Sequence, residues 1–438
     1  MDRLHALDTA WLAMEGDGPP IAIGTVAVAE GPPPSDGEIA DLLMERLPDM
    51  GRLRERLVHG GALRRPSWST DATAALAQQT HRVECCAEHG GLDAMVSGIM
   101  ETRMPRDRPL WDLWVVQDAD SDRWALVWRV HHSIADGLGA LVLLGHAFDL
   151  QPGPGRTLAD LAVESGRSSS ASRQLLAGLA ALPTALPRLP DVVAAVLPKS
   201  PSPLSGPVGD RRRWVSVTVP LDEVAAVRAA LGGTVNDVVL AAVAAGFRRL
   251  LEHRGLPTRG RSVRNAVPVS VRPPAGVRSD NEVSLLLARL PVGVDDPVER
   301  LRQVRREVAA MRAFGVPVAL VGLLGLVDRL VPAAALEAVV RTAGRTVPAW
   351  YLDTLTTNVP GPRVPVYLAG RRVQAMFPII PVAGRTRITT GIFSYDGSLH
   401  IGVTGDGEQA ADVDVLAAGI RDGVAELASL AASAAPAR

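Results

Sequence analysis

The chain has 438 residues, of which 47% are hydrophobic and 21% charged, and its formal net charge is −1. This composition is that of an ordinary globular protein and excludes a largely disordered chain. The near-neutral charge, with only three Tyr and five Phe, argues against a nucleic-acid-binding surface.

The cysteine pattern and the N-terminus indicate the compartment. Cys85 and Cys86 are adjacent, and no CxxC or Cys/His ligand spacing occurs. Adjacent cysteines rarely bridge to each other, because a disulfide requires Cα atoms about 5.5 Å apart. The N-terminal residues MDRLHALDTAWLAMEG lack the apolar core of a signal peptide. We therefore expect a cytoplasmic protein that keeps its thiols reduced.

Strand and helix patterns are mixed over residues 1–150, which we take as an N-terminal half. Residues 21–31 (IAIGTVAVAEG) predict a strand, and residues 35–57 predict a helix broken near Pro48. Residues 122–130 (DRWALVWRV) are mostly apolar on both faces. This pattern predicts a central strand.

A change in composition follows at residues 151–212. Pro, Gly and Ser are frequent there, and the helical stretches are interrupted by Pro183, Pro187 and Pro190. Such a segment is typical of a long crossover with short helices between two halves.

Residues 213–438 return to alternating strand and helix patterns and form the expected C-terminal half. Thr234 and Asp237 predict a capping box at the start of a helix that ends before Gly255. Asp396-Gly397 is a hairpin turn between two alternating runs, and a closing amphipathic helix follows. The expected fold class is α/β (α+β), with two halves joined by the crossover.

The longest apolar run is Ala313–Val327, which contains Pro317. It is shorter than the about 20 residues of a membrane span. It is either a buried helix or a helix that lines an apolar pocket or rests on a membrane surface.

Two adjacent histidines, His131 and His132, end the central strand, and Asp136-Gly137 follows before a helix. Ligand sites favour such strand ends. We expect no metal, because a zinc site needs three or four ligands and adjacent histidines point apart. No GxSxG motif occurs, and Ser133 is poorly placed as a nucleophile. The remaining interpretations are structural core histidines, or a general base that accepts a proton from a bound hydroxyl.

The segment HHSIADG resembles the HHxxxDG signature of the CoA-dependent acyltransferase superfamily, which includes chloramphenicol acetyltransferase and peptide-synthetase condensation domains. Other blocks resemble the bacterial wax ester synthase/diacylglycerol acyltransferase family. LHALDTAWLAMEG resembles its opening LSPxDxxFLxxE, and RPLWDLWVVQ contains its PLW. Asn236-Asp237 resembles its ND motif. NAVPVSVRP, TTNVPGP and GIFSYDGSLHIGVTGD resemble three further blocks, so the similarity runs from the first ten residues to the last helix.

Two departures from the family pattern concern the acceptor and the acyl length. The family often has Met-His where this chain has Ile21-Ala22, and an Asn near the end of the crossover is Ser205 here. Neither departure falls within the HHxxxDG motif itself.

The resemblance implies two chloramphenicol-acetyltransferase-like halves, each a mixed sheet flanked by helices, that meet at a cleft. It implies His132 as general base without a covalent acyl-enzyme, and His131 as support for the loop. Asp136 is then structural, with Arg272 as its partner. Gly137 permits a close turn beside the substrate.

Further residues are candidates around the substrate. Asn236 either has a polar role, such as a donor to an oxyanion, or only caps its helix. Thr357 and Asn358 are expected in a tight turn that faces the cleft. Asp237 and Trp111 are expected to be structural, Trp111 as core packing.

Arg385 and Arg387 either meet a phosphate of CoA or lie on a solvated face. The sequence does not decide between these two interpretations.

The resemblance also implies the substrates: acyl-CoA as cosubstrate and a long-chain alcohol or diacylglycerol as hydroxyl acceptor, with no cofactor. Alternatives are a specialised-metabolite hydroxyl or amine acylated from a carrier-protein thioester, and a non-catalytic lipid-binding relative. The intact HHxxxDG argues against the last. Long chains need an apolar channel, for which Ala313–Val327 and the Ala-rich residues 238–247 are candidates. Peripheral association with a membrane or lipid-droplet surface stays open.

Overall fold

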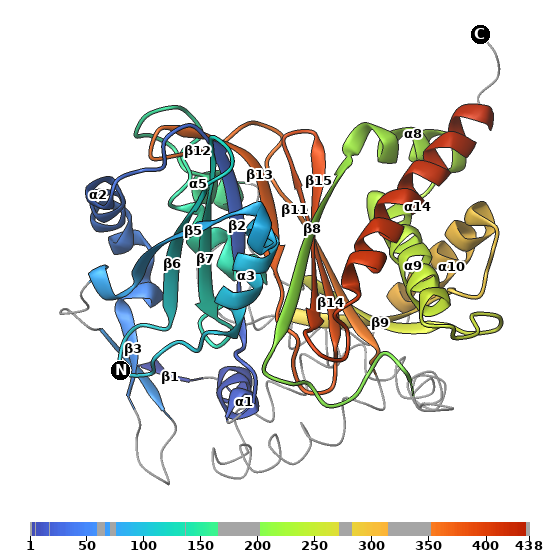
Figure 1. The fold of residues 1–438 in the computed structure, drawn as a ribbon, viewed down its shortest axis with the longest axis horizontal. Helices are drawn as coiled ribbons and strands as arrows, with labels where there is room; N and C mark the ends of the chain where they lie inside the picture. Colours follow the sequence, from blue (N-terminus) through green and yellow to red (C-terminus); the bar gives the residue numbers. More distant parts are fainter. Residues whose placement is uncertain are drawn as a thin grey trace.

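The computed structural model describes residues 2–4, 6–16, 18–58, 66–70, 76–135, 137–164, 202–270, 283–313 and 352–434. Two six-stranded sheets stand next to each other, and helices cover their outer sides (Figure 1). Asp136, Arg272 and nearly all of Ala313–Val327 lie outside the described residues. The expected class, two mixed sheets flanked by helices, is confirmed.

The first sheet has the strand order β12-β13-β2-β7-β6-β5. Its strands are β2 (Ala22–Glu30), β5 (Thr80–Cys85), β6 (Trp111–Asp118), β7 (Arg123–His131), β12 (Tyr367–Leu368) and β13 (Arg371–Ile379). Only the β5–β6 pair is parallel. β7 lies between β2 and β6 and is buried along nearly its whole length, which confirms the predicted central strand.

Two strands of this first sheet come from the C-terminal part of the sequence. β13 pairs with β2 between Val373 and Ile379, and β12 pairs with β13 at the edge. Residues from both 1–150 and 213–438 therefore build the first sheet.

The second sheet has the strand order β10-β9-β11-β14-β15-β8. Its strands are β8 (Arg212–Pro220), β9 (Val263–Ser270), β10 (Val283–Leu290), β11 (Thr354–Pro360), β14 (Ile388–Tyr395) and β15 (Ser398–Asp406). β11 is parallel to both of its neighbours, and the other pairs are antiparallel. Asp396 and Gly397 both have positive φ, 41° and 84°, as a tight turn between β14 and β15 requires.

The helices are α1 (Ala6–Glu15), α2 (Asp36–Arg46), α3 (Gly91–Glu101), α4 (Gly137–Gly145), α5 (Leu158–Glu164), α8 (Leu221–Leu231), α9 (Val235–His253), α10 (Pro297–Ala313) and α14 (Val413–Ala434). Short 3-10 turns are η1 (Leu47–Asp49), η2 (Gly51–Arg54), η3 (Leu76–Gln78) and η4 (Ala87–His89). A small sheet contains β1 (Asp2–Arg3), β4 (Ser67–Thr70) and β3 (Glu55–Val58).

The helix expected over residues 35–57 is shorter in the structure. It ends at Arg46, η1 and η2 follow, and residues 55–58 form β3. Pro48 lacks the N–H that a continuing helix needs, so the break is sharper than a kink.

α9 begins with the predicted capping box. The Thr234 hydroxyl accepts from the Asp237 N–H at 3.2 Å, and the Asp237 carboxylate accepts from the Thr234 N–H at 2.8 Å. α9 crosses α14 closely at Gly246, where a Cβ would lie 2.7 Å from the Leu416 carbonyl oxygen. Nearly all residues from Val238 to Phe247 are buried in the core between these helices and the second sheet.

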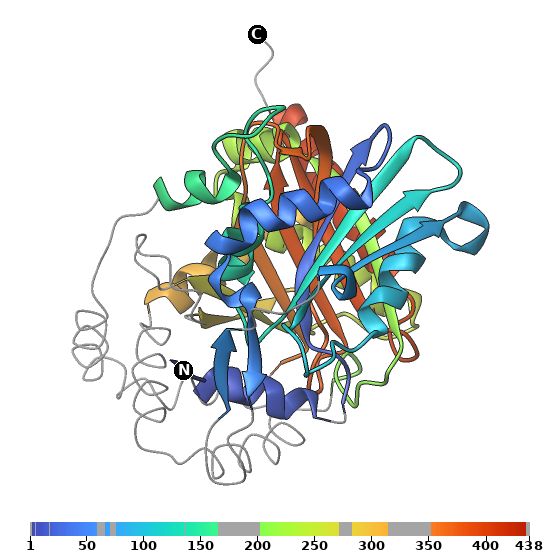
Figure 2. The same cartoon turned by 90° about the vertical axis from the view of Figure 1, so that its left-hand side faces the viewer.

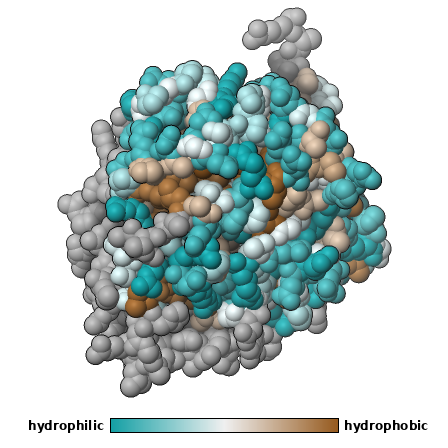
Figure 3. Space-filling view, turned by 60° about the vertical axis from the view of Figure 1, so that its left-hand side comes forward, coloured by the Kyte–Doolittle hydropathy of each residue, from teal (hydrophilic) through white to brown (hydrophobic). Residues whose placement is uncertain are grey.

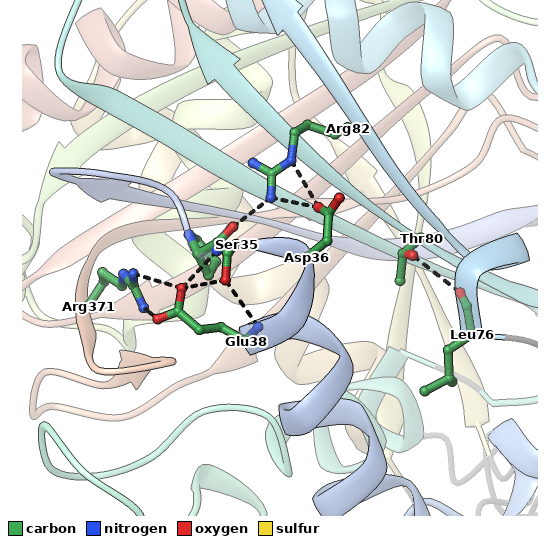
Figure 4. A network of polar contacts seen from close by, with 8 residues as sticks. Ser35, Asp36, Glu38, Leu76, Thr80, Arg82 and Arg371 are labelled. Carbon is green, nitrogen blue, oxygen red and sulfur yellow. Dashed lines mark hydrogen bonds and ion pairs between the residues drawn. The ribbon is translucent and has the colours of Figure 1, made fainter.

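The N-terminus of α2 is tied to two strands of the first sheet (Figure 4). Ser35 caps the helix, and its backbone N–H donates to Glu38 at 2.8 Å. Arg371 of β13 donates to Glu38 at 2.6 Å, and Arg82 of β5 donates to Asp36 at 2.9 Å. The Arg371 hydrogen bond, with those from Ser35, lowers the pKa of Glu38 to about 2. α2 crosses one end of the first sheet, and α1 lies at the other end (Figure 2).

Candidate active site

The two histidines stand in a turn that is held from both sides of β7. The His131 N–H donates to the Leu110 carbonyl, next to β6, at 2.9 Å. The His132 N–H donates to the Ile21 carbonyl, next to β2, at 3.0 Å. The Ile134 N–H then closes the turn onto the His131 carbonyl at 2.9 Å. The backbone of the pair is therefore fixed by the central position of β7.

His131 is buried, with 2% of its surface exposed. The Ser133 backbone N–H donates to its Nδ1 at 3.1 Å, and the Ser133 hydroxyl oxygen lies 2.7 Å from the same atom. A backbone N–H can only donate, so Nδ1 is the accepting nitrogen and the proton of the neutral ring is on Nε2. Nε2 lies 3.5 Å from a carboxylate oxygen of Glu15.

His132 is partly exposed and has a different neighbour. Its ring stacks on the indole of Trp11, with ring centroids 4.1 Å apart and an interplanar angle of 19°. The indole therefore covers one face of the imidazole and restricts rotation of the ring.

Glu15, at the end of α1, is a buried carboxylate with several donors. It accepts from the Ile21 N–H at 3.2 Å and from Arg106 at 2.9 Å. Burial by itself raises the pKa of Glu15. The contact with His131, together with the donors Arg106 and Ile21, outweighs the effect of burial and lowers the pKa of Glu15 to about 2. Glu15 is therefore ionised at neutral pH.

Sequence reasoning missed the site contacts of Trp11 and Glu15, although both belong to the opening block LHALDTAWLAMEG. Their spacing of four residues places them on one face of α1. That spacing was a usable signal, because a helix aligned with the end of β7 can present both side chains to the two histidines.

An apolar pocket lies where the two sheets meet. Residues of β2, α4, β11, β13 and β14 line it, among them Ile23, Ala140, Val359, Ile379 and Phe393. Of its described lining residues only Thr25 and Thr357 carry polar side chains. The cavity that the lining residues enclose is narrow, with a volume of about 70 Å³.

The Ala-rich residues 238–247, candidates for such a lining, do not line this pocket, because they are buried in the core of the second sheet. On the face in Figure 3, polar side chains surround hollows in which apolar side chains are seen.

The structure separates the candidate substrate-binding residues into two groups. Thr357 and Asn358 lie within β11, so the tight turn expected for them is wrong. Thr357 lines the apolar pocket, and Gly137 begins α4, which also contributes to it. The Asn358 side-chain amide donates to the side-chain oxygen Oδ1 of Asn236 at 3.4 Å, so these two residues meet at the start of α9. The cap of α9 is made by Thr234 and Asp237, as predicted for Asp237, and not by Asn236.

Trp111 lies in the core. It is 2% exposed, its indole N–H donates to the Leu53 carbonyl at 2.8 Å, and its ring packs near Trp128 at 6.0 Å. These contacts support core packing over substrate contact.

The remaining polar candidates lie elsewhere. Arg387 donates to the Pro207 carbonyl at 3.1 Å, and burial, together with the nearby Arg385 charge, lowers its pKa. Cys85 and Cys86 are both free thiols. Burial raises the pKa of Cys85, and the Cys86 sulfur lies 2.9 Å from His89 Nδ1.

Among the described residues, no three His, Cys, Asp or Glu side chains come together as metal ligands. None of the described helices is by itself long and apolar enough to cross a membrane, although the bent pair α8 and α9, at 104°, passes on length and composition.

Two models of known families match successive parts of the chain. A model of the wax ester synthase/diacylglycerol acyltransferase catalytic domain matches residues 4–239, and a model of the WS/DGAT C-terminal domain matches residues 279–428. The chain belongs to the wax ester synthase/diacylglycerol acyltransferase family. It is therefore an acyltransferase.

A relative of this WS/DGAT family member matches it over nearly its whole length. The probable diacylglycerol O-acyltransferase tgs1 of Mycobacterium tuberculosis is 32% identical, and the match covers 98% of this chain and 96% of that protein.

Solved structures show the same fold at lower identity. The wax ester synthase/diacylglycerol acyltransferase from Marinobacter aquaeolei VT8 has a TM-score of 0.73 at 22% identity, covering 99% of this chain and 100% of that chain. The first condensation domain of the calcium-dependent antibiotic synthetase has a TM-score of 0.61 at 18% identity, covering 98% and 96%. The chain thus shares its fold with these two proteins.

Proposed function

We propose that this WS/DGAT member transfers a fatty acyl group from acyl-CoA to a hydroxyl acceptor, a long-chain alcohol or a diacylglycerol, with His132 as general base. The observation that carries the proposal is the placement of His132. Its ring is partly exposed and stacks on Trp11. His132 follows the end of β7, next to the start of β2, and the first residues of β2 line the apolar pocket. His131, which is buried and paired with Glu15, is unsuited to receive a substrate proton.

The chemistry follows from one base and no protein nucleophile. His132 accepts the proton of the acceptor hydroxyl as its oxygen attacks the thioester carbonyl, and a C–O bond forms. The tetrahedral intermediate carries an oxyanion, for which Asn236 is a candidate donor. When the C–S bond breaks, the imidazolium of His132 returns its proton to the CoA sulfur. Ester and free CoA leave, and acyl-CoA is a cosubstrate rather than a resident cofactor.

The apolar pocket favours an aliphatic chain over a small polar metabolite. A site built for polar acceptors would present hydrogen-bonding side chains, and the described lining offers only Thr25 and Thr357. Lipid acceptors of this kind are presented at membrane or lipid-droplet surfaces. Peripheral association with such a surface, from the cytoplasm, is therefore part of the same proposal.

The test measures thiol release from acyl-CoAs of rising chain length, each with a long-chain alcohol, a diacylglycerol, a small polar hydroxyl or amine acceptor, or no acceptor. We expect release that depends on a lipid acceptor and favours long acyl chains. Release that occurs only with small polar hydroxyl or amine acceptors would overturn the proposal. Binding of acyl-CoA without release under any condition would instead identify a non-catalytic lipid-binding protein.

A pocket variant refines this test. Ala140→Leu adds bulk inside the apolar pocket, so the preferred chain, acyl or alkyl, should become shorter by a few carbons. The matched control is Ala432→Leu on the exposed side of α14, which should leave the chain-length profile unchanged.

A further inference from the structure

α1 contacts both histidines of the turn with side chains one helical turn apart. Trp11 stacks on the His132 ring at 4.1 Å, and the Glu15 carboxylate lies 3.5 Å from His131 Nε2. Residues at i and i+4 share one face of a helix, so the position of α1 sets both contacts together.

We propose that α1 positions the base, which rests on His132 acting as proposed above. Trp11 fixes the plane of the His132 ring. Glu15 is a positioning residue that acts through His131.

Glu15 is connected to both sides of the histidine turn. Its Oε2 faces His131, and its Oε1 accepts from the Ile21 N–H at 3.2 Å. The Ile21 carbonyl in turn accepts the His132 N–H at 3.0 Å. A single buried carboxylate thus contacts the ring of one histidine and is linked through one residue, Ile21, to the backbone of the other.

The tautomer of His131 makes this contact directional. Nδ1 accepts from the Ser133 N–H, so Nε2 carries the ring proton and lies 3.5 Å from a Glu15 carboxylate oxygen. An ionised carboxylate at this distance attracts the polar N–H group. Replacing the carboxylate with an amide of the same size removes the charge while leaving the volume.

The C-terminal end of α1 is itself held in place by hydrogen bonds from two arginines. Arg106 donates to the Leu12 carbonyl at 3.3 Å as well as to Glu15, and Arg103 donates to the Gly16 carbonyl at 3.0 Å. Cations at a helix C-terminus complement its dipole. Gly16, with φ of +35°, ends the helix directly after Glu15.

A purely structural role would act on stability, whereas a positioning role acts on the chemical step. A misplacement of about 1 Å in a reacting group can cost on the order of 100-fold in rate. We therefore expect Glu15→Gln and Trp11→Leu each to lower kcat about tenfold. The KM for acyl-CoA should stay within about twofold, because neither side chain is placed in the apolar pocket. Trp11→Phe keeps an aromatic face and should recover most of the kcat.

The decisive experiment is a double-mutant cycle between Glu15→Gln and His131→Gln, read as kcat with the melting temperature recorded for each variant. If Glu15 acts through His131, the kcat of the double variant should be only slightly lower than that of the less active single variant. Asp412→Asn is the control. It removes a carboxylate that pairs with Arg254 in the C-terminal part, and it should leave kcat unchanged.

Losses that multiply in the double variant, or wild-type kcat in both Glu15→Gln and Trp11→Leu, would overturn the inference. His132→Ala, measured in the same assay, separates the two proposals. If His132→Ala is inactive while the α1 variants are normal, only the positioning role fails. If His132→Ala turns over normally, the proposed function fails.

Discussion

His131 and His132 are neighbours in the chain, but the structure gives them opposite surroundings. His131 is buried between Ser133 and the ionised Glu15. His132 is partly exposed, with one ring face covered by Trp11. A general base must reach its substrate, while a buried ring can only support it. The division of roles between the two histidines therefore follows from burial and from hydrogen bonding.

A second buried histidine, His400 on β15, gives a prediction about stability. Its ring packs edge-on against Phe377 of β13 at 5.1 Å, and its Nδ1 lies 3.3 Å from the Thr218 hydroxyl. Burial lowers its pKa to about 4, against smaller opposing effects of Tyr395 and Asp396. The folded state thus binds this proton more weakly than the unfolded state does.

Stability from His400 is therefore fully present above about pH 6.5 and is lost as the pH falls toward 4. Thermal melts from pH 7.5 to 4.5 should show the wild-type melting temperature falling more steeply than that of His400→Leu. The contribution is at most about 3 kcal/mol, taken as 1.36 kcal/mol per pKa unit. Parallel pH profiles of the two proteins would show that His400 does not titrate in this way.

At the residue scale, much of the site could be predicted because its signals are local. The HH pair at a strand end and the Thr234–Asp237 box need only neighbouring residues. The contact between Asn236 and Asn358, 122 positions apart, could not be predicted, because no local pattern encodes which strand passes the start of α9.

At the scale of elements, β13 is the strand that joins the two parts of the sequence. It pairs with β2, and Arg371 at its start binds Glu38 of α2. Tyr395 strengthens the connection. Its hydroxyl donates to the Val373 carbonyl at 2.8 Å and accepts from the Val366 N–H at 2.9 Å. The first sheet and its core are thus completed by residues after position 360.

This arrangement predicts how fragments behave. Residues 1–212 expressed alone lack β12 and β13, so the edge of β2 and the apolar core beneath it are exposed. We expect this fragment to aggregate or to unfold without a cooperative transition, and co-expression with residues 213–438 to restore a soluble complex. A sharp melt and native near-UV circular dichroism for residues 1–212 alone would contradict this prediction.

The pairing of β13 with β2 could not be predicted from the sequence. Alternation identifies a strand, such as residues 122–130, and a mostly apolar run shows that it is central. Strand partners, however, are set by long-range packing that alternation does not contain. For this reason the sequence predicted two halves, residues 1–150 and 213–438, but did not predict that the second half supplies β13 to the sheet of the first.

At the scale of the whole molecule, the two sheets meet around the apolar pocket. Residues of β2 and β13 line it from the first sheet, residues of β11 and β14 line it from the second sheet, and α4 also contributes. The need for an apolar channel followed from the family resemblance. Its lining did not, because the Ala-rich residues 238–247 have the composition of a channel wall and of a tightly crossed core helix alike. The close crossing at Gly246 shows that they are the latter.

The proposal that His132 is the base for acyl transfer is tested most directly by His132→Ala, assayed as acceptor-dependent thiol release from a long-chain acyl-CoA. Loss of a general base typically costs ~10²–10⁴-fold in rate. We predict a loss in that range with an unchanged melting temperature, and an unchanged rate for the control His89→Ala, whose side chain is exposed beside Cys86. Turnover by His132→Ala near that of the wild type would contradict the proposed mechanism.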